Sequence, residues 1–267
     1  MEKRIRFSDL EIGKRGISLM LDALLRGWIS EGRYVKEFER LFAEKFGYRH
    51  AVATSSGTDA LICACFALYD LGAQRGDEII VPALTFVSSA NAVLAAGFIP
   101  RFVDIEVETL NIDPSKIEDA ITKRTVAIMP VHLMGKPAPM REIKEIAQSH
   151  NLRLVEDGCE AHGASYYDQV VGSIGDVGCF SFYVAHFMTC GEGGMAVTNN
   201  DQIADLLRSV RSHGRPPGNL FFDFQRLGLN SKMNDMEAAI GIEGMENFEV
   251  DWEKRRNNLA RLLTLTQ

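Results

Sequence analysis

The sequence lacks the features that would place it in a membrane or on nucleic acid. No apolar run is long enough to span a bilayer, and residues 1–10 are charged rather than signal-like. Acidic residues outnumber basic ones, 36 to 29, which gives a net charge of −7. A surface with this net charge is not attracted to nucleic acid or to an anionic membrane. Internal repeats and low-complexity segments are also missing. These absences favour a cytoplasmic globular protein without a nucleic-acid or membrane partner.

Cysteine is scarce, and its pattern is not that of a metal or disulfide site. The five cysteines include no C-x-x-C pair. Cys63 and Cys65 are two residues apart on a predicted helix, so they point in different directions and cannot share a metal. We therefore expect buried, reduced thiols and no metal site. The G-x-S-x-G motif of many serine hydrolases is absent too, which argues against a hydrolase.

What the sequence does contain is an alternation of strand-like and helical runs. This order predicts an α/β fold: a mostly parallel sheet of about seven strands with helices on both faces. Ligands of such sheets bind beyond the carboxyl ends of the strands. The strand-like runs are 50–53, 78–81, 100–104, 125–131 and 153–156, followed by two neighbouring runs, 179–183 and 195–198, around a Gly-rich loop. The helical runs are 15–26, 34–46, 57–71, 88–97, 114–122, 140–150 and 201–212, with another helix near Met236.

The chain is expected to hold one large domain and the beginning of another. Residues 1–245 form the large domain, with a helical arm over about 1–30. Residues 246–267 begin a C-terminal domain that is largely missing, because too few residues follow Gly241 to form a core.

Three segments carry candidate chemistry. The loop TSSGTDAL (54–61) contains Ser56, Gly57 and Thr58 at a helix start, where free amides and hydroxyls can bind a phosphate; a simple helix N-cap is the alternative. The run LVED (154–157) ends in Asp157, which can either keep a cofactor's ring nitrogen protonated or cap the next helix. His186 lies in the Gly-rich loop on the expected ligand side.

Several blocks in a fixed order make a family resemblance specific. From Ser30 to Gly241 the chain resembles the DegT/DnrJ/EryC1/StrS family of sugar aminotransferases and dehydratases. The resemblance implies the aspartate-aminotransferase fold (fold type I) and a pyridoxal or pyridoxamine phosphate cofactor. The blocks are SSGTDAL (55–61), VPALTFVSSANAV (81–93), VEDGCEAHGA (155–164), GDVGCFSF (175–182) with GEGGMAVTN (191–199), and GLNSKMNDMEAAIG (228–241).

The resemblance also implies roles for individual residues. Asp157 matches the acid on the pyridine nitrogen, and Phe86 matches the aromatic that stacks on the ring. Glu160 lies where many members have Gln, and we include it among the cofactor-binding residues. Asn230 matches a residue that reaches the phosphate in the neighbouring subunit, which implies a homodimer with shared sites. The phosphate-binding positions are matched by Gly57, Thr58 and Ser181, beside Ser56.

One departure from the family decides the expected sub-class. Aminotransferases of this family read S-F-x-x-x-K, and the lysine binds pyridoxal phosphate covalently; here the sixth position is His186. Lys232 is the nearest alternative, but it fills a position usually held by Arg. The pattern V-A-H-x-x-T-x-G-E-G-G resembles the 3-dehydratases of deoxysugar biosynthesis, and no cysteine follows Cys190 to carry the iron cluster of one branch. The resemblance therefore implies a cluster-free dehydratase.

That reading gives His186 and Asp157 the catalytic roles. The expected substrate is a nucleotide-linked 4-keto-6-deoxyhexose, with pyridoxamine phosphate held non-covalently and His186 acting as the base. Two alternatives stay open: an aminotransferase that has lost its lysine, and a homologue that binds a nucleotide sugar without turning it over.

Overall fold

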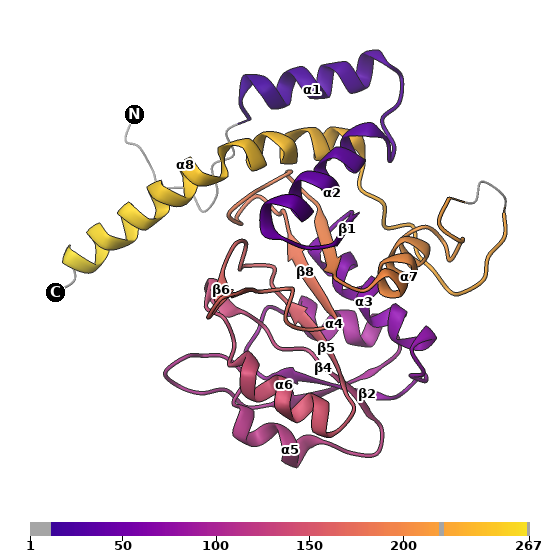
Figure 1. Cartoon of the computed structure of the whole chain (residues 1–267), viewed down its shortest axis with the longest axis vertical. Coiled ribbons are helices and arrows are strands. Elements are labelled where there is room, and N and C mark those ends of the chain that lie inside the picture. Colours follow the sequence, from indigo (N-terminus) through magenta and orange to yellow (C-terminus); the bar gives the residue numbers. More distant parts are fainter. Residues whose placement is uncertain (1–11, 219–221, 266–267) are drawn as a thin grey trace.

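A computed structural model of the chain describes residues 12–218 and 222–265 (Figure 1). Residues 1–11, which include the charged start and part of the expected arm, lie outside the described residues. The centre is a seven-stranded sheet in the order β1-β9-β8-β5-β4-β2-β3, and β6 and β7 form a separate ribbon. The strands are β1 (His50–Thr54), β2 (Glu78–Pro82), β3 (Ile99–Val103), β4 (Thr125–Ile128), β5 (Arg153–Asp157), β6 (Ser165–Tyr166), β7 (Gln169–Val170), β8 (Val177–Ser181) and β9 (Gly194–Thr198).

The strand directions confirm the mostly parallel sheet. Strands β3, β2, β4, β5 and β8 pair in parallel along the sheet, whereas β9 is antiparallel to both β8 and β1. Strand β1 therefore runs in the same direction as β8, and only β9 is reversed among the strands described in this sheet. Six carboxyl ends consequently lie at one edge.

The helices alternate with these strands as the sequence predicted, with two differences. The predicted helix 114–122 is divided into a 3₁₀ turn and a single turn of α-helix. The predicted strand 125–131 ends at Ile128, because Pro130 has no amide hydrogen to continue the pairing. The helices are α1 (Lys14–Leu25), α2 (Arg33–Phe46), α3 (Gly57–Asp70), α4 (Ser88–Ala95), α5 (Ile117–Ala120), α6 (Met140–Ser149), α7 (Asp201–Arg211) and α8 (Asp235–Leu265), with 3₁₀ turns η1 (Pro114–Lys116) and η2 (Leu133–Gly135).

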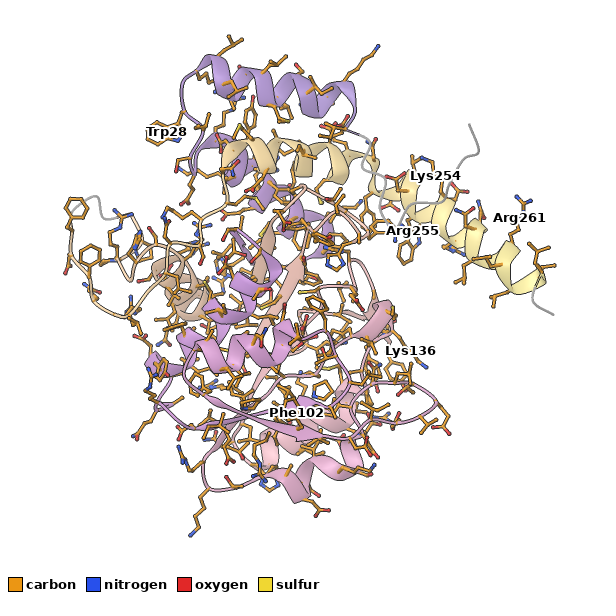
Figure 2. All side chains as sticks on the ribbon, turned by 180° about the vertical axis from the view of Figure 1, so that it is seen from behind. Trp28, Phe102, Lys136, Lys254, Arg255 and Arg261 are labelled. Atoms are coloured by element: carbon orange, nitrogen blue, oxygen red, sulfur yellow. The ribbon has the colours of Figure 1, made fainter. Side chains whose placement is uncertain are left out.

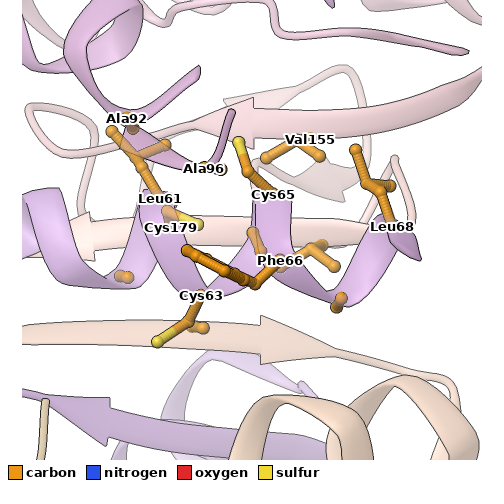
Figure 3. Close-up of a cluster of buried hydrophobic side chains, with 14 of the residues drawn as sticks. Leu61, Cys63, Cys65, Phe66, Leu68, Ala92, Ala96, Val155 and Cys179 are labelled. Carbon is orange, nitrogen blue, oxygen red and sulfur yellow. The ribbon is translucent and has the colours of Figure 1, made fainter. Parts of the chain in front are cut away.

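One face of the sheet is covered by α3, α4 and α7. Because side chains alternate along a strand, Val155 and Cys179 reach this face. Figure 3 shows Val155 next to Cys65 of α3, and Cys179 and Cys63 belong to the same cluster. The two α3 thiols are fully buried and free, and burial raises the pKa of each to about 12. The expectation of buried, reduced thiols is confirmed for Cys63, Cys65, Cys179 and Cys190, whereas Cys159 is free but only partly buried.

The opposite face carries two further clusters. Helices α2 and α8 cover β1, β8 and β9, and Phe38 and Phe42 of α2 lie in one cluster with Phe180 of β8. Helices α5 and α6 cover the remaining part of this face, where Ile128 of β4 and Leu154 of β5 are buried beneath them. Leu154 and Val155 thus point to opposite faces, and the same alternation separates the two acids that end β5.

Helix α8 is a single long helix that crosses the molecule next to α1 and α2 and then extends away from it (Figure 1). Its buried residues extend from Asp235 to Phe248. The domain division predicted at 245/246 falls within this helix and stays a prediction. None of the described helices is both long and apolar enough to cross a membrane.

Candidate functional site

The candidate residues gather at the edge of the sheet formed by the strand carboxyl ends. Thr54, Asp157 and Ser181 are the last residues of β1, β5 and β8. Strand β9 lies between β1 and β8 and starts at this edge with Gly194. The loops 55–57, 158–163 and 182–193 therefore leave the sheet side by side, which is where a ligand was expected.

The start of α3 packs directly on the end of β8. A Cβ atom at Gly57 would lie 2.5 Å from Ser181 Cβ and 3.0 Å from Cys159 Sγ, so only glycine fits. Ser56 caps the helix, because its hydroxyl accepts from the Asp59 amide at 3.0 Å. The amides of Gly57 and Thr58 have no acceptor within the helix. The loop is thus an N-cap, and its glycine and the two amides that lack an acceptor within the helix also leave it suited to bind a phosphate. The N-cap and the phosphate-binding interpretation of its sequence are therefore compatible.

The starts of α3 and α4 are joined to each other and to Asp157. Thr58 Oγ1 donates to Ser88 Oγ at 2.9 Å. Ser89, which is fully buried, donates to Asp157 Oδ2 at 2.7 Å. Sequence reasoning missed both serines, although they lie in the VSSAN block, because it had no signal for a contact between this helix and β5.

The two acids that end β5 have separate surroundings. Asp157 shares the face of Val155 and, besides Ser89, accepts from the Cys159 amide at 3.2 Å. Glu156 points to the other face, where its oxygens accept from the amides of residues 172, 174 and 175 and from His132 at 3.0 Å. The carboxylate of Glu156 is therefore saturated within the core, and that of Asp157 keeps free lone pairs.

Two further predicted residues flank Asp157. Glu160 Oε2 accepts from the Met134 amide at 2.6 Å, in a turn where Met134 has a positive φ of 52°. Phe86 precedes α4, its carbonyl accepts from the Ser89 amide at 3.2 Å, and its side chain is 71% exposed. An exposed aromatic ring at this edge can stack on a planar ligand.

His186 lies in the loop between β8 and β9. The loop is closed at its base, where the Phe182 amide donates to the Gly193 carbonyl at 2.9 Å, and the His186 amide donates to the Tyr183 carbonyl at 2.9 Å. Burial lowers the pKa of the imidazole; Glu160 and Asp157 oppose this shift, and Arg255 adds to it. His186 is thus within electrostatic reach of both candidate carboxylates, and its neutral form is favoured.

Sequence reasoning did not single out His162, although it lies in the AHGA segment. Its ring is buried 5.4 Å from that of Phe182 and 6.4 Å from that of His186. Within the described part of the chain neither ring nitrogen has a hydrogen-bond partner. Burial lowers its pKa to about 3, helped by His186 when that ring is protonated and by Arg255, so His162 is neutral at physiological pH.

Asn230 lies on the exposed side of the glycine cradle. The Ser55 amide donates to the Ser231 carbonyl at 2.9 Å, which places the 230–232 segment beside β1. The Asn230 side chain is exposed and accepts from Lys232, whose pKa is lowered by burial. Its predicted contact with a neighbouring subunit stays a prediction.

The arrangement fits a phosphorylated pyridine cofactor. A cradle that a single Cβ would fill, with two free amides, suits a phosphate, and a buried carboxylate with free lone pairs suits a protonated ring nitrogen. Ser89 connects Phe86 to that carboxylate, because its amide donates to the Phe86 carbonyl and its hydroxyl donates to Asp157.

Comparisons with known proteins agree with this fit. The chain is 43% identical over 253 residues to GDP-perosamine synthase from Caulobacter vibrioides, covering 91% of this chain and 67% of that one. An E. coli GDP-4-keto-6-deoxy-D-mannose-3-dehydratase with bound hydrated PLP superposes with a TM-score of 0.89 at 31% identity, covering 97% and 71% of the two chains. NtdA from Bacillus subtilis, solved with PMP, gives 0.81 at 33% identity, covering 93% and 58%.

These structures confirm the predicted fold type and cofactor class. The chain spans about two thirds of the length of the curated relatives it matches. Residues 11–266 match one family description along their whole length. The chain belongs to the DegT/DnrJ/EryC1/StrS aminotransferase family.

Proposed function

We propose that the chain is the cofactor-binding part of a PMP/PLP-dependent 3-dehydratase that acts on a nucleotide-linked 4-keto-6-deoxyhexose. The observation that carries the proposal is the position of His186, in the loop between β8 and β9 and within reach of the charges of Asp157 and Glu160. An imidazole cannot replace lysine as a stable covalent attachment for PLP, but it takes up and releases protons near neutral pH.

In this proposal each candidate residue holds a different part of the cofactor. The cradle of Gly57, Thr58 and Ser181 binds the phosphate, and Ser56 fixes the helix start that presents the amides. Asp157 holds the proton on the ring nitrogen, with its carboxylate oriented by Ser89. The Phe86 ring covers one face of the pyridine, and Glu160 lies beside it.

When bound, the cofactor supplies a pyridine ring that accepts electrons from bonds next to its amine. His186 in its neutral form removes the proton at the cofactor's C4′ carbon. In its protonated form it gives a proton to the C3 hydroxyl oxygen of the sugar as that group leaves. Because burial lowers its pKa, His186 is neutral at the start of this sequence, as a base must be.

The variant His186→Asn tests the proposal. It should keep PMP binding, because the phosphate and ring contacts lie on other residues, and PMP titration followed by absorbance measures this. Dehydration of a GDP-linked 4-keto-6-deoxyhexose should fall by about 10²- to 10⁴-fold, the usual effect of losing a general base. A variant that retains most of its dehydration rate would rule out His186 as the base.

An aminotransferase without its lysine is the second candidate, favoured by the GDP-perosamine synthase relative and by the family description. The mass of the product separates the two, since transamination adds an amine and leaves the C3 hydroxyl in place. The variant His186→Lys should bind PLP covalently, as shown by a mass increase after borohydride treatment, and should transfer amino groups. Binding of the nucleotide sugar without any product would instead support a non-catalytic homologue.

A further inference from the structure

The residue after His186 is held by one face of helix α8. The ring centroid of Phe187 lies 4.7 Å from that of Phe248 and 5.8 Å from that of Trp252, and the Arg255 guanidinium lies 4.9 Å from the Phe187 centroid. The three α8 residues are spaced by four and three positions, so they share one side of the helix. We call Phe187 and these three partners the Phe187 anchor.

Arg255 contacts both Phe187 and the backbone of His186. Its Nη2 donates to the His186 carbonyl at 3.2 Å while its plane covers the neighbouring ring. A guanidinium can stack and donate at the same time because it is flat, which an ammonium group cannot do. Figure 2 shows Arg255 on the side of α8 that faces the body of the protein.

The helix that carries the anchor is itself firmly attached at this point. Phe248 packs edge-on against Phe46 of α2 at 5.2 Å, and Lys45 forms an ion pair with Glu249 at 2.7 Å. The anchor therefore connects the His186 loop, through Phe248, to the cluster formed by α2, α8 and the sheet. Through Trp252 and Arg255 it also contacts the part of α8 that continues beyond this cluster.

The charges that face His186 come from different elements. Glu160, in the loop after β5, and Asp157, the last residue of β5, favour its protonated form, and Arg255, on α8, opposes it. The neutral ring of His162 lies 6.4 Å away, and Tyr183 of the same loop lies 6.1 Å away. Arg255 is thus the positive charge on α8 that offsets the two carboxylates.

We propose that helix α8 positions His186 through the Phe187 anchor and that Arg255 is a positioning residue for the reaction. The role in the reaction rests on the function proposed above, whereas the anchor itself does not. Without Arg255 the loop would lose its hydrogen bond and cation–π contact with α8 and keep only the contacts of Phe187 with Phe248 and Trp252. The imidazole would then face two carboxylates without a compensating charge.

Substitutions of Arg255, of Phe187 and of a control residue test the proposal in the cofactor-free protein. Arg255→Met removes the charge and the hydrogen bond, and Arg255→Lys keeps the charge but not the flat contact. Arg256→Met is the matched control, because the next residue points about a quarter turn away along the exposed helix. Hydrogen exchange of the amides of residues 183–190 and the NMR titration of His186, assigned with His186→Asn, are the readouts.

With Arg255→Met, loop exchange should become about two- to fivefold faster, as expected for losing an exposed cation–π contact. The titration midpoint of His186 should rise, because the opposing positive charge is gone. Arg255→Lys should speed exchange but leave the midpoint near that of the wild type, and Phe187→Leu should speed exchange similarly. The proposal is overturned if Arg255→Met and Arg256→Met behave alike in both measurements. Since neither readout uses substrate, failure of the dehydratase assignment would leave this test intact.

Discussion

At the scale of single residues, the end of β5 shows how adjacent acids acquire different roles. Glu156 faces three amides and His132 in the core, whereas Asp157 faces the serine at the start of α4 and the site. The division follows from the period of two along a strand, which sends neighbouring side chains to opposite faces. A sequence shows that period but not which face holds the ligand.

The variant Ser89→Ala tests whether Asp157 is oriented from α4. It removes the hydroxyl that donates to Asp157 Oδ2 at 2.7 Å and leaves the Cys159 amide, at 3.2 Å from Oδ1, to orient the carboxylate. We expect PMP to bind about tenfold more weakly, the usual effect of losing one hydrogen bond to a charged group. Equilibrium titration measures this, with Ser149→Ala, at an exposed position at the end of α6, as the control. Unchanged PMP affinity would contradict the role of Ser89.

His162 should make the protein sensitive to acid. An unfolded histidine takes up a proton below about pH 6.5, whereas buried His162 stays neutral down to about pH 3. The unfolded chain therefore binds more protons than the folded protein between these two pH values. The contribution of His162 to the free energy of unfolding is complete above about pH 6.5 and is lost as the pH falls towards about 3. In His162→Phe this loss, about 1.4 kcal/mol per pH unit at most, should disappear from urea unfolding curves. An equally steep acid dependence in the variant, with exposed His150→Gln as reference, would show that His162 is not responsible.

The candidate site was partly visible in the sequence at this scale. The strand pattern placed Gly57 just beyond the carboxyl end of a predicted strand, whereas Ser181 lay within the predicted strand 179–183. Only the family resemblance assigned both residues to one phosphate site. Ser89 and His162 could not be assigned, because their environment depends on packing between segments far apart in the chain. The Phe187 anchor was hidden for the same reason: Phe187 and Arg255 belong to separate elements, and no local pattern joins them.

At the scale of elements, the buried Glu156 carboxylate connects β5 to the segments on either side of it. It accepts from three amides of the 172–175 turn and from His132, whose Nδ1 in turn accepts from the Ala138 amide at 3.0 Å. One side chain therefore satisfies the backbone of a turn that has no sheet partner of its own. The strand cannot shift without breaking these bonds.

The variant Glu156→Gln should weaken this connection without changing the size of the side chain. Its NH₂ group would face amide donors, so at least one buried donor is left without an acceptor. We expect the free energy of unfolding to fall by about 2–4 kcal/mol, measured by urea denaturation. Glu145→Gln, on the exposed side of α6, should change it by less than about 0.5 kcal/mol. A loss no larger than in this control would mean that Glu156 does not hold the turn.

Element boundaries followed from the sequence where a local cause exists. The αL glycine Gly47 ends α2 and the Ser56 cap begins α3, at the expected positions. Helix α8 was harder to predict, because it continues beyond Phe248 although its buried face ends there. Hydrophobic pattern marks where a helix is buried, not where it stops.

At the scale of the whole molecule, the predicted assembly is a homodimer with cofactor sites at the subunit boundary. Asn230 is exposed beside the glycine cradle, a position from which a side chain can reach a second subunit. Sedimentation of the protein should show a dimer, and Asn230→Ala should weaken PMP binding only where the dimer forms. A monomer that binds PMP at full strength would contradict the shared site.

The reversed strand β9 also has a consequence for how the chain is made. Strand β1 leaves the ribosome early, yet its partner β9 follows only about 140 residues later, and helix α8 emerges later still. Until then the backbone N–H and C=O groups of β1 have no strand partner, and the aromatic face of α2 remains uncovered. Strands β2 to β5 are closer in sequence and can associate sooner. Nascent chains halted before residue 194 should therefore be ordered in the middle and should need a chaperone at the amino-terminal segment.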